Sequence, residues 1–170
     1  MKKIIYFVAV LFLLKILNGC GYQPIYSSQN INLKIVNQYY EGSTDLAQRV
    51  YAKINNILFF DNNAKEVDLK IFASKNKSTT STDSSGNALS YKITLNTELT
   101  MTNIFSDQVL ANENITLSES YKVKDQAYQS EKLENDVISN LIDRVGQEFL
   151  LKISQAGLDK WFSKVTRLKN

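Results

Sequence analysis

Two stretches in the second half of the chain alternate apolar and polar residues with a period of two. From 89 to 101 most odd-numbered positions are apolar and the even-numbered ones are polar, and the alternation resumes from 109 to 123. This period is typical of strands that bury one face and expose the other. Ser106-Asp107-Gln108 lies between them as a turn candidate. The sequence therefore predicts a long antiparallel hairpin with one face that must be covered.

Two further strands and two helices supply the remaining elements. Strand-type alternation also occurs at 31–35 and at 67–71, whereas helical spacing of apolar residues runs over 46–58 and 130–153. A break at Gly42-Ser43 precedes the first helix. Strands and helices that each carry one apolar side pack best as two layers. We therefore expect an α+β two-layer sandwich of order β-α-β-β-β-α, in which both helices cover one face of a four-stranded mixed or antiparallel sheet.

The segment from Ser74 to Asn87 has a different composition. It consists of lysine, serine, threonine, asparagine, aspartate and one glycine, without an apolar residue that could anchor it in a core. We expect it to be a mobile loop.

The N-terminus combines a basic start with a short apolar run that leads to the only cysteine. Lys2 and Lys3 precede the run Ile4–Leu14, and Leu17-Asn18-Gly19 lead directly to Cys20. A run this short does not span a bilayer stably, which indicates a targeting segment that is later removed. The residues at the cut resemble the lipobox of bacterial lipoproteins, in which the cysteine is acylated. The alternative is a plain N-terminal anchor with an inert Cys20.

Removal of that segment defines the domain organisation. We expect a lipoprotein signal peptide at 1–19, an acylated tether and lead-in at 20–29, a single α/β domain at 30–156 and a basic C-terminal tail at 157–170. The 151 residues left after removal of 19 from 170 suit one domain of ordinary size. Two or three acyl chains on Cys20, palmitate among them, would hold this domain to a membrane, because one chain binds only marginally.

The charge balance changes with processing. The whole chain has 20 Lys plus Arg against 17 Asp plus Glu, and Lys2, Lys3 and Lys15 are the only charged residues before Cys20. Processing therefore leaves 17 basic and 17 acidic residues, so the mature chain is neutral overall. The basic character belongs to the targeting segment, and we expect no nucleic-acid partner.

The residue inventory argues against an enzyme. The chain has no histidine, which removes the commonest general base and the commonest zinc ligand. A single cysteine allows no intramolecular disulfide. We find no catalytic motif, no metal-ligand set and no cofactor-binding motif, and we expect a non-enzymatic protein.

Two acidic residues interrupt the apolar alternation of the fourth strand. Glu113 and Glu119 share parity with the apolar positions, so they either line a cleft as a pair or are turned to solvent by a bulge or a frayed strand. In the last helix we expect Asp143-Arg144, Glu148 and Lys152 on a solvated outer face, with Glu148 and Lys152 forming a weak i,i+4 pair.

Five lysines form the candidate binding set. They fall near the polar segment or on the outward faces of the hairpin strands, where they could meet the phosphates of a lipid headgroup. The alternative is that they solubilise the strand faces and protect an edge. The candidate residues are Lys75, Lys77, Lys92, Lys122 and Lys124.

The opening of the processed chain resembles a known family. Cys20-Gly21-Tyr22-Gln23-Pro24-Ile25-Tyr26 is similar to the mature start of the lipopolysaccharide-assembly lipoproteins, the LptE family. The expected order of elements and the mature length are also similar to that family. The resemblance implies an outer-membrane lipoprotein on the periplasmic face that plugs the β-barrel partner LptD, binds lipopolysaccharide and helps to deliver it to the outer leaflet. A scaffolding lipoprotein of another envelope or secretion complex is the alternative.

Overall fold

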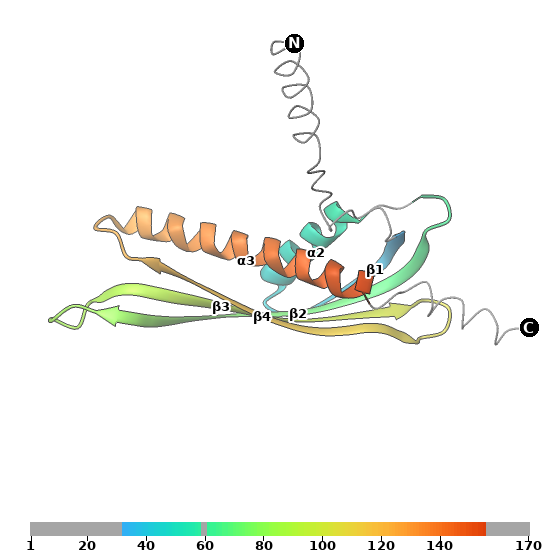
Figure 1. Cartoon of the computed structure of the whole chain (residues 1–170), viewed down its shortest axis with the longest axis horizontal. Helices are drawn as coiled ribbons and strands as arrows, with labels where there is room; N and C mark the ends of the chain where they lie inside the picture. Colours follow the sequence, from blue (N-terminus) through green and yellow to red (C-terminus); the bar gives the residue numbers. More distant parts are fainter. Residues whose placement is uncertain (1–31, 59–60, 156–170) are drawn as a thin grey trace, which may run out of the picture.

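The computed structural model describes residues 32–58 and 61–155, which form a four-stranded sheet with two helices on one face (Figure 1). In chain order the elements are β1 (Leu33–Gly42), α2 (Thr44–Ile57), β2 (Lys65–Thr82), β3 (Ala88–Asn103), β4 (Val109–Lys122) and α3 (Ala127–Gln155). The predicted α+β two-layer fold and its order of elements are confirmed. Cys20, the predicted signal peptide, the tether and the C-terminal tail lie outside the described residues.

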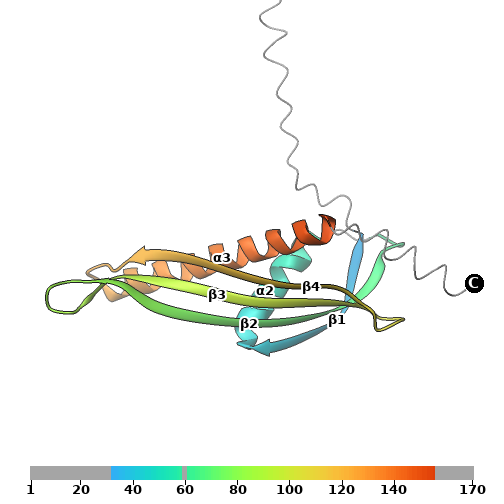
Figure 2. The same ribbon diagram turned by 60° about the horizontal axis from the view of Figure 1, so that its bottom comes forward.

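The sheet is mixed, with strands in the order β1-β2-β3-β4. β1 runs parallel to β2, whereas β2 with β3 and β3 with β4 are antiparallel. Two parallel neighbours need a crossover, and α2 supplies it. Figure 2 views the sheet from its open side and shows both helices behind it. The other face of the sheet carries no helix among the described residues.

The strands differ in length, and this gives the molecule two distinct ends. β1 accompanies β2 only from Leu33, opposite Lys65, to Gly42, opposite Ala73. β2 then continues with β3 to Thr82. We call the end with the start of β1, the β3–β4 turn and the end of α3 the proximal end. The end with the β2–β3 turn and the start of α3 is the distal end (Figure 1).

The core lies between the helices and the first part of the sheet. The fully buried helix-facing side chains of β2 and β3 are Val67, Leu69, Ile71, Ala73, Ile93, Leu95, Leu99 and Met101. The helices contribute Ala47, Val50, Ile54, Leu141, Val145 and Phe149, which are fully buried too. Burying one such large apolar side chain is worth roughly 1.5–3 kcal/mol, so this layer supplies most of the driving force for folding. Thr97 and Asn103 are the buried polar residues of β3, and the Thr97 hydroxyl donates to the Ile115 carbonyl at 3.0 Å.

Gly42 allows the chain to turn from β1 into α2. Its φ is +73°, a conformation that side chains with a Cβ rarely adopt, and a Cβ here would collide with the Ala73 carbonyl oxygen. The next residue, Ser43, donates its backbone N–H to that same oxygen at 2.8 Å. The break predicted at Gly42-Ser43 is therefore the point where α2 is held against β2.

The predicted loop at Ser74–Asn87 is wrong. Residues 74–82 continue β2 and pair with β3, and the turn itself is confined to the residues around Asp83 and Gly86. The Asp83 carboxylate accepts the backbone N–H groups of Ser85 and Asn87, both at 2.8 Å, and so fixes the turn. Composition misled the prediction because this part of β2 has little apolar cover on either face. The ladder of backbone hydrogen bonds with β3 holds it instead.

Other element boundaries also moved. β1 extends past the predicted 31–35 to Gly42 after a bulge between Ile35 and Asn37. A second irregularity opposite Met101 and Thr102 leaves Val109 half exposed and buries Leu110, so the alternation of β4 does not start at Val109 as predicted. α3 begins three residues before Ser130, whose hydroxyl bonds the backbone of Lys124 instead of opening the helix. Neither described helix is both long enough and apolar enough to span a bilayer.

Candidate functional site

The helix-facing positions of β2 change from apolar to polar at the point where β1 ends and α2 begins. Ala73 is the last fully buried one, and Lys75 and Lys77 follow it on the same face. Of the elements that the structure describes, only α3 extends over this distal half of the sheet (Figure 1). Long polar side chains therefore have room to cross from β2 towards α3, which explains why the apolar alternation of β2 ends here.

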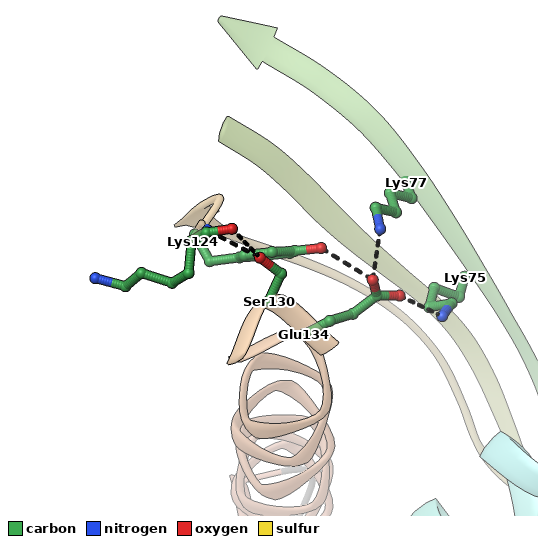
Figure 3. Close-up of polar contacts among 6 residues, drawn as sticks. Lys75, Lys77, Lys124, Ser130 and Glu134 are labelled. Atoms are coloured by element: carbon green, nitrogen blue, oxygen red, sulfur yellow. Dashed lines mark hydrogen bonds and ion pairs between the residues drawn. The ribbon is translucent and has the colours of Figure 1, made fainter. Parts of the chain in front are cut away.

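Glu134, near the start of α3, receives three hydrogen bonds from the sheet (Figure 3). Lys75 Nζ donates to Oε1 at 2.9 Å, and Lys77 Nζ donates to Oε2 at 2.6 Å. The Tyr121 hydroxyl also donates to Oε2, at 2.9 Å. We call Lys75, Lys77, Tyr121 and Glu134 the distal cluster. It ties β2, β4 and α3 together at the distal end.

The electrostatics of the distal cluster favour the ionised carboxylate. Burial alone would raise the pKa of Glu134, whose side chain is 18% exposed, but the hydrogen bonds from Lys77, Lys75 and Tyr121 outweigh burial and hold its pKa at about 2. The hydrogen bond to Glu134 in turn raises the pKa of Lys77. Burial raises the pKa of Tyr121, so its phenol remains a donor at neutral pH. One carboxylate thus faces two ammonium groups, and the cluster carries one surplus positive charge.

The Lys77 ammonium also lies over two aromatic rings. Its Nζ lies 4.2 Å from the ring centre of Tyr91 and 5.7 Å from that of Tyr121. The two rings are themselves in contact, with centres 5.8 Å apart. A cation at this distance over a ring is attracted by the π-electron face. Lys77 is therefore a positioned cation, and the surplus charge of the cluster suits a second anionic group such as a phosphate oxygen.

The other three candidate lysines do not join the distal cluster. Lys92 and Lys122 lie on the opposite face of the sheet, where Lys92 pairs in register with Ser120 and Lys122 with Ser90. Lys124 follows β4, and its side chain points away from Ser130 and Glu134 (Figure 3). The structure thus brings two of the five predicted lysines together and places the other three elsewhere around the distal end.

Both interpretations of Glu113 and Glu119 are wrong. The two residues stay on the helix-facing side of a regular part of β4, and each pairs with a base of α3. Glu113 Oε2 lies 2.9 Å from Lys152 Nζ, and Glu119 Oε2 lies 3.9 Å from the Arg144 guanidinium. They occupy the flank of the core, where the carboxylates can reach basic side chains of the helix.

The predicted solvated face of α3 needs the same correction. Lys152 and Glu148 do pair, but at 3.9 Å, and the shorter contact of Lys152 is with Glu113 on the sheet. Asp143 pairs with Lys53 of α2 at 2.9 Å. These charged side chains of α3 therefore connect the helix to its neighbours, although each is partly exposed and each pair contributes little alone.

On β3 and β4 the open face of the sheet carries mainly short uncharged polar side chains, with Lys92, Glu98 and Lys122 as the charged residues among them. The uncharged side chains form cross-strand pairs, with Thr94 Oγ1 2.9 Å from Ser118 Oγ and Thr116 donating to Asn96 at 3.1 Å. The even-numbered short uncharged polar residues on the two strands are Ser90, Thr94, Asn96, Thr100, Thr102, Asn112, Asn114, Thr116, Ser118 and Ser120. The β3–β4 part of this face therefore offers many uncharged hydrogen-bond donors and acceptors.

Sequence reasoning did not single out Glu134 or Tyr121. Glu134 lies 59 residues from Lys75 and 57 from Lys77 along the chain, so no local spacing indicates their contact. A usable signal was the parity of β2, since Lys75 and Lys77 continue the helix-facing series of Ala73. Among the described residues no group of three or more acidic or cysteine side chains is placed to hold a metal ion.

The fold is shared with solved structures of bacterial lipoproteins. A minor lipoprotein from Acinetobacter baumannii aligns at a TM-score of 0.53 with 14% identity, over 74% of this chain and 93% of that one. An uncharacterized lipoprotein B from Nitrosomonas europaea aligns at 0.50 with 16% identity, over 76% and 90%. A structure from Caulobacter crescentus aligns at 0.52 with 14% identity, over 82% and 93%. At these identities the likeness shows the fold.

No protein-family model matches the chain, and no curated protein matches it significantly in sequence.

Proposed function

We propose that this chain is an outer-membrane lipoprotein, anchored through acylated Cys20 on the periplasmic face, that plugs an LptD-like β-barrel and helps to assemble lipopolysaccharide in the outer leaflet. The observation that carries the proposal is the combination of an LptE-like opening, Cys20 to Tyr26, with a fold shared with bacterial lipoproteins. Its role is structural and ligand-binding, with no catalytic step.

The surfaces of the domain suit a plug. A protein that fills the lumen of a barrel needs an exterior that can hydrogen-bond a polar wall without a large net charge. The open sheet face has that character over β3 and β4, and the processed chain has equal numbers of basic and acidic residues. In this proposal the open face lies against the barrel wall.

The distal cluster suits the anionic part of the glycolipid. From Lys65 to Thr82 the strand rises about 55 Å at ~3.3 Å per residue, which carries Lys75 and Lys77 far from the proximal end. A phosphate arriving there meets ammonium groups that Glu134 already engages. Binding therefore occurs by sharing or displacing the Glu134 carboxylate, and Lys92, Lys122 and Lys124 add positive charge around the same end.

The test is recovery of the partner from native envelopes. The full chain is expressed in a Gram-negative host, crosslinked in the membrane, solubilised and purified through an affinity tag at Asn170. The proposal expects one large outer-membrane β-barrel as the main partner, together with lipopolysaccharide. Recovery of only peptidoglycan-associated or inner-membrane complexes would refute it and favour the scaffolding role.

A matched variant tests the anchor. We expect Cys20→Ala to leave a folded domain that fractionates with soluble periplasmic protein when the barrel is not co-expressed, because the acyl chains provide the membrane attachment. Intact-mass analysis of the parent chain should find acylation at Cys20 and loss of residues 1–19. An unmodified Cys20 still joined to its leader contradicts the anchor.

A further inference from the structure

The turn between β3 and β4 presents an apolar surface at the proximal end. Phe105 is 73% exposed, and Val109, where β4 begins, is 50% exposed. Most large apolar side chains of the described strands and helices are buried. An aromatic ring left in water to this extent forgoes the free energy that burial would supply.

The exposure of Phe105 is a property of an ordered turn. Asn103, itself 5% exposed, accepts the Phe105 backbone N–H with its side-chain oxygen at 2.8 Å. The Asn103 backbone donates to Gln108 at 2.9 Å and accepts from Asp107 at 3.0 Å. Asp107 closes the turn with a φ of +52°. These bonds fix the direction in which the turn projects, so Phe105 is held away from the core.

The turn lies at the same end as the exit of the chain towards Cys20. Asn103 pairs with Val67, near the start of β2, where Lys65 also pairs with Leu33 at the start of β1. Both views place the turn and the start of β1 at one end of the molecule (Figures 1 and 2). Reciprocal hydrogen bonds between Asn32 and Asp61, at 2.7 and 3.1 Å, fix the point where the described chain begins.

The length of chain between the anchor and the domain limits where the proximal end can be. Eleven residues lie between Cys20 and Asn32, and the twelve Cα-to-Cα steps that join the two reach at most about 43 Å when the chain is fully extended. A bilayer that holds Cys20 is thus within reach of the proximal end at all times. Because the anchor already holds the chain at the bilayer, contact between the turn and that bilayer takes place at a high effective concentration. A contact that is too weak to bring an untethered protein to the membrane can therefore form here.

We infer that the β3–β4 turn is a second membrane contact, in which Phe105 enters the headgroup region of the bilayer that holds the acylated cysteine. The inference rests on the proposed anchor and adds an orientation to it. With both points on the membrane, the proximal end faces the lipid and the distal cluster points away from it. The occupant of the Phe105 surface is lipid because the ring projects from the end that the tether keeps beside a bilayer.

The test compares two tryptophan reporters of equal exposure at opposite ends. Trp161, the only tryptophan of the chain, is replaced by phenylalanine, and Phe105→Trp or Tyr128→Trp is then introduced. Tyr128, at the start of α3, is 74% exposed and serves as the matched control. The full acylated chain is reconstituted in vesicles of phosphatidylethanolamine and phosphatidylglycerol, with and without brominated phospholipid. We expect Phe105→Trp to shift its emission to shorter wavelength and to be quenched, and Tyr128→Trp to do neither.

Two results would overturn the inference. Absence of quenching at Phe105→Trp in chains that float with the vesicles shows that the turn stays in water or serves a protein partner. Equal quenching of both reporters shows that the domain lies flat on the bilayer. A variant with a hexahistidine tag in place of residues 1–20, held by nickel-chelating lipid, repeats the measurement without acylation. A failed anchor then appears as loss of flotation of the parent chain only, separately from failure of the turn.

Discussion

Replacement of Glu134 by glutamine removes the charge that holds the distal cluster together. The carboxylate is 18% exposed, and its pKa is held at about 2 instead of near 4.5. Because a tenfold change in proton affinity corresponds to about 1.4 kcal/mol, this difference is worth ~3 kcal/mol at neutral pH. The two lysines are partly solvated, which reduces the expected loss of unfolding free energy for Glu134→Gln to about 2 kcal/mol.

The pH dependence gives the same prediction a second readout. Since the pKa of Glu134 is lower in the folded chain, its contribution is fully present above about pH 4.5 and is lost as the pH falls towards about 2. Glu134→Gln should lack this part of the acid destabilisation.

The assay is urea unfolding of the processed chain carrying Cys20→Ala, followed by circular dichroism between pH 7 and pH 2.5. Glu131→Gln is the control, since Glu131 is exposed one turn earlier on α3 and makes no ion pair with the described residues. If the two variants have the same unfolding free energy at pH 7 and the same acid profile, the reasoning about the distal cluster is wrong.

Two further predictions concern binding and the backbone. The double variant Lys75→Gln, Lys77→Gln should weaken the binding of lipopolysaccharide vesicles, as measured by co-flotation. The loss should be largest at low salt, because interactions between exposed charges are screened as ionic strength rises. An equal loss from Lys92→Gln alone would assign the binding to the open face instead. Gly42→Ala should lower the unfolding free energy by clearly more than Gly86→Ala. Both sites have positive φ, but only at Gly42 does a carbonyl oxygen occupy the place of a Cβ. Equal melting temperatures of the two variants in thermal unfolding would contradict the packing argument.

The parts of the fold that the sequence predicted are those whose side chains report burial directly. β3 was predicted because its odd-numbered positions from Leu89 to Met101 are apolar apart from Thr97, and both helices were predicted from their apolar stripes. The distal half of β2 was missed because its lysine, serine and threonine residues show no apolar alternation. Backbone hydrogen bonds to β3 hold this part of the strand, and the polarity of its side chains does not indicate them. Its pairing with β3 depends on register, which is set by the whole hairpin.

The candidate site was only half visible for a related reason. Lys75 and Lys77 could be selected as cations, but their shared partner comes from a helix more than fifty residues later in the chain. The same holds for Glu113 and Glu119, whose bases lie on α3. Contacts of this kind depend on how the helix is placed across the sheet, and no periodicity within one segment encodes that placement.

Because β1 ends at Gly42, the sheet has two parts. We call the four-stranded proximal part with its two helices the block, and residues 74–82 of β2 with their β3 partners the arm. Beyond Ala73 the strand β2 rises about 30 Å further to Thr82, at ~3.3 Å per residue, with β3 beside it and no β1 on its other side. Backbone amides along this outer reach are expected to exchange with solvent faster than those of the block, because fewer buried contacts must open. A molecule that binds at the β2–β3 turn can therefore change the conformational fluctuations of the arm while the block keeps its structure.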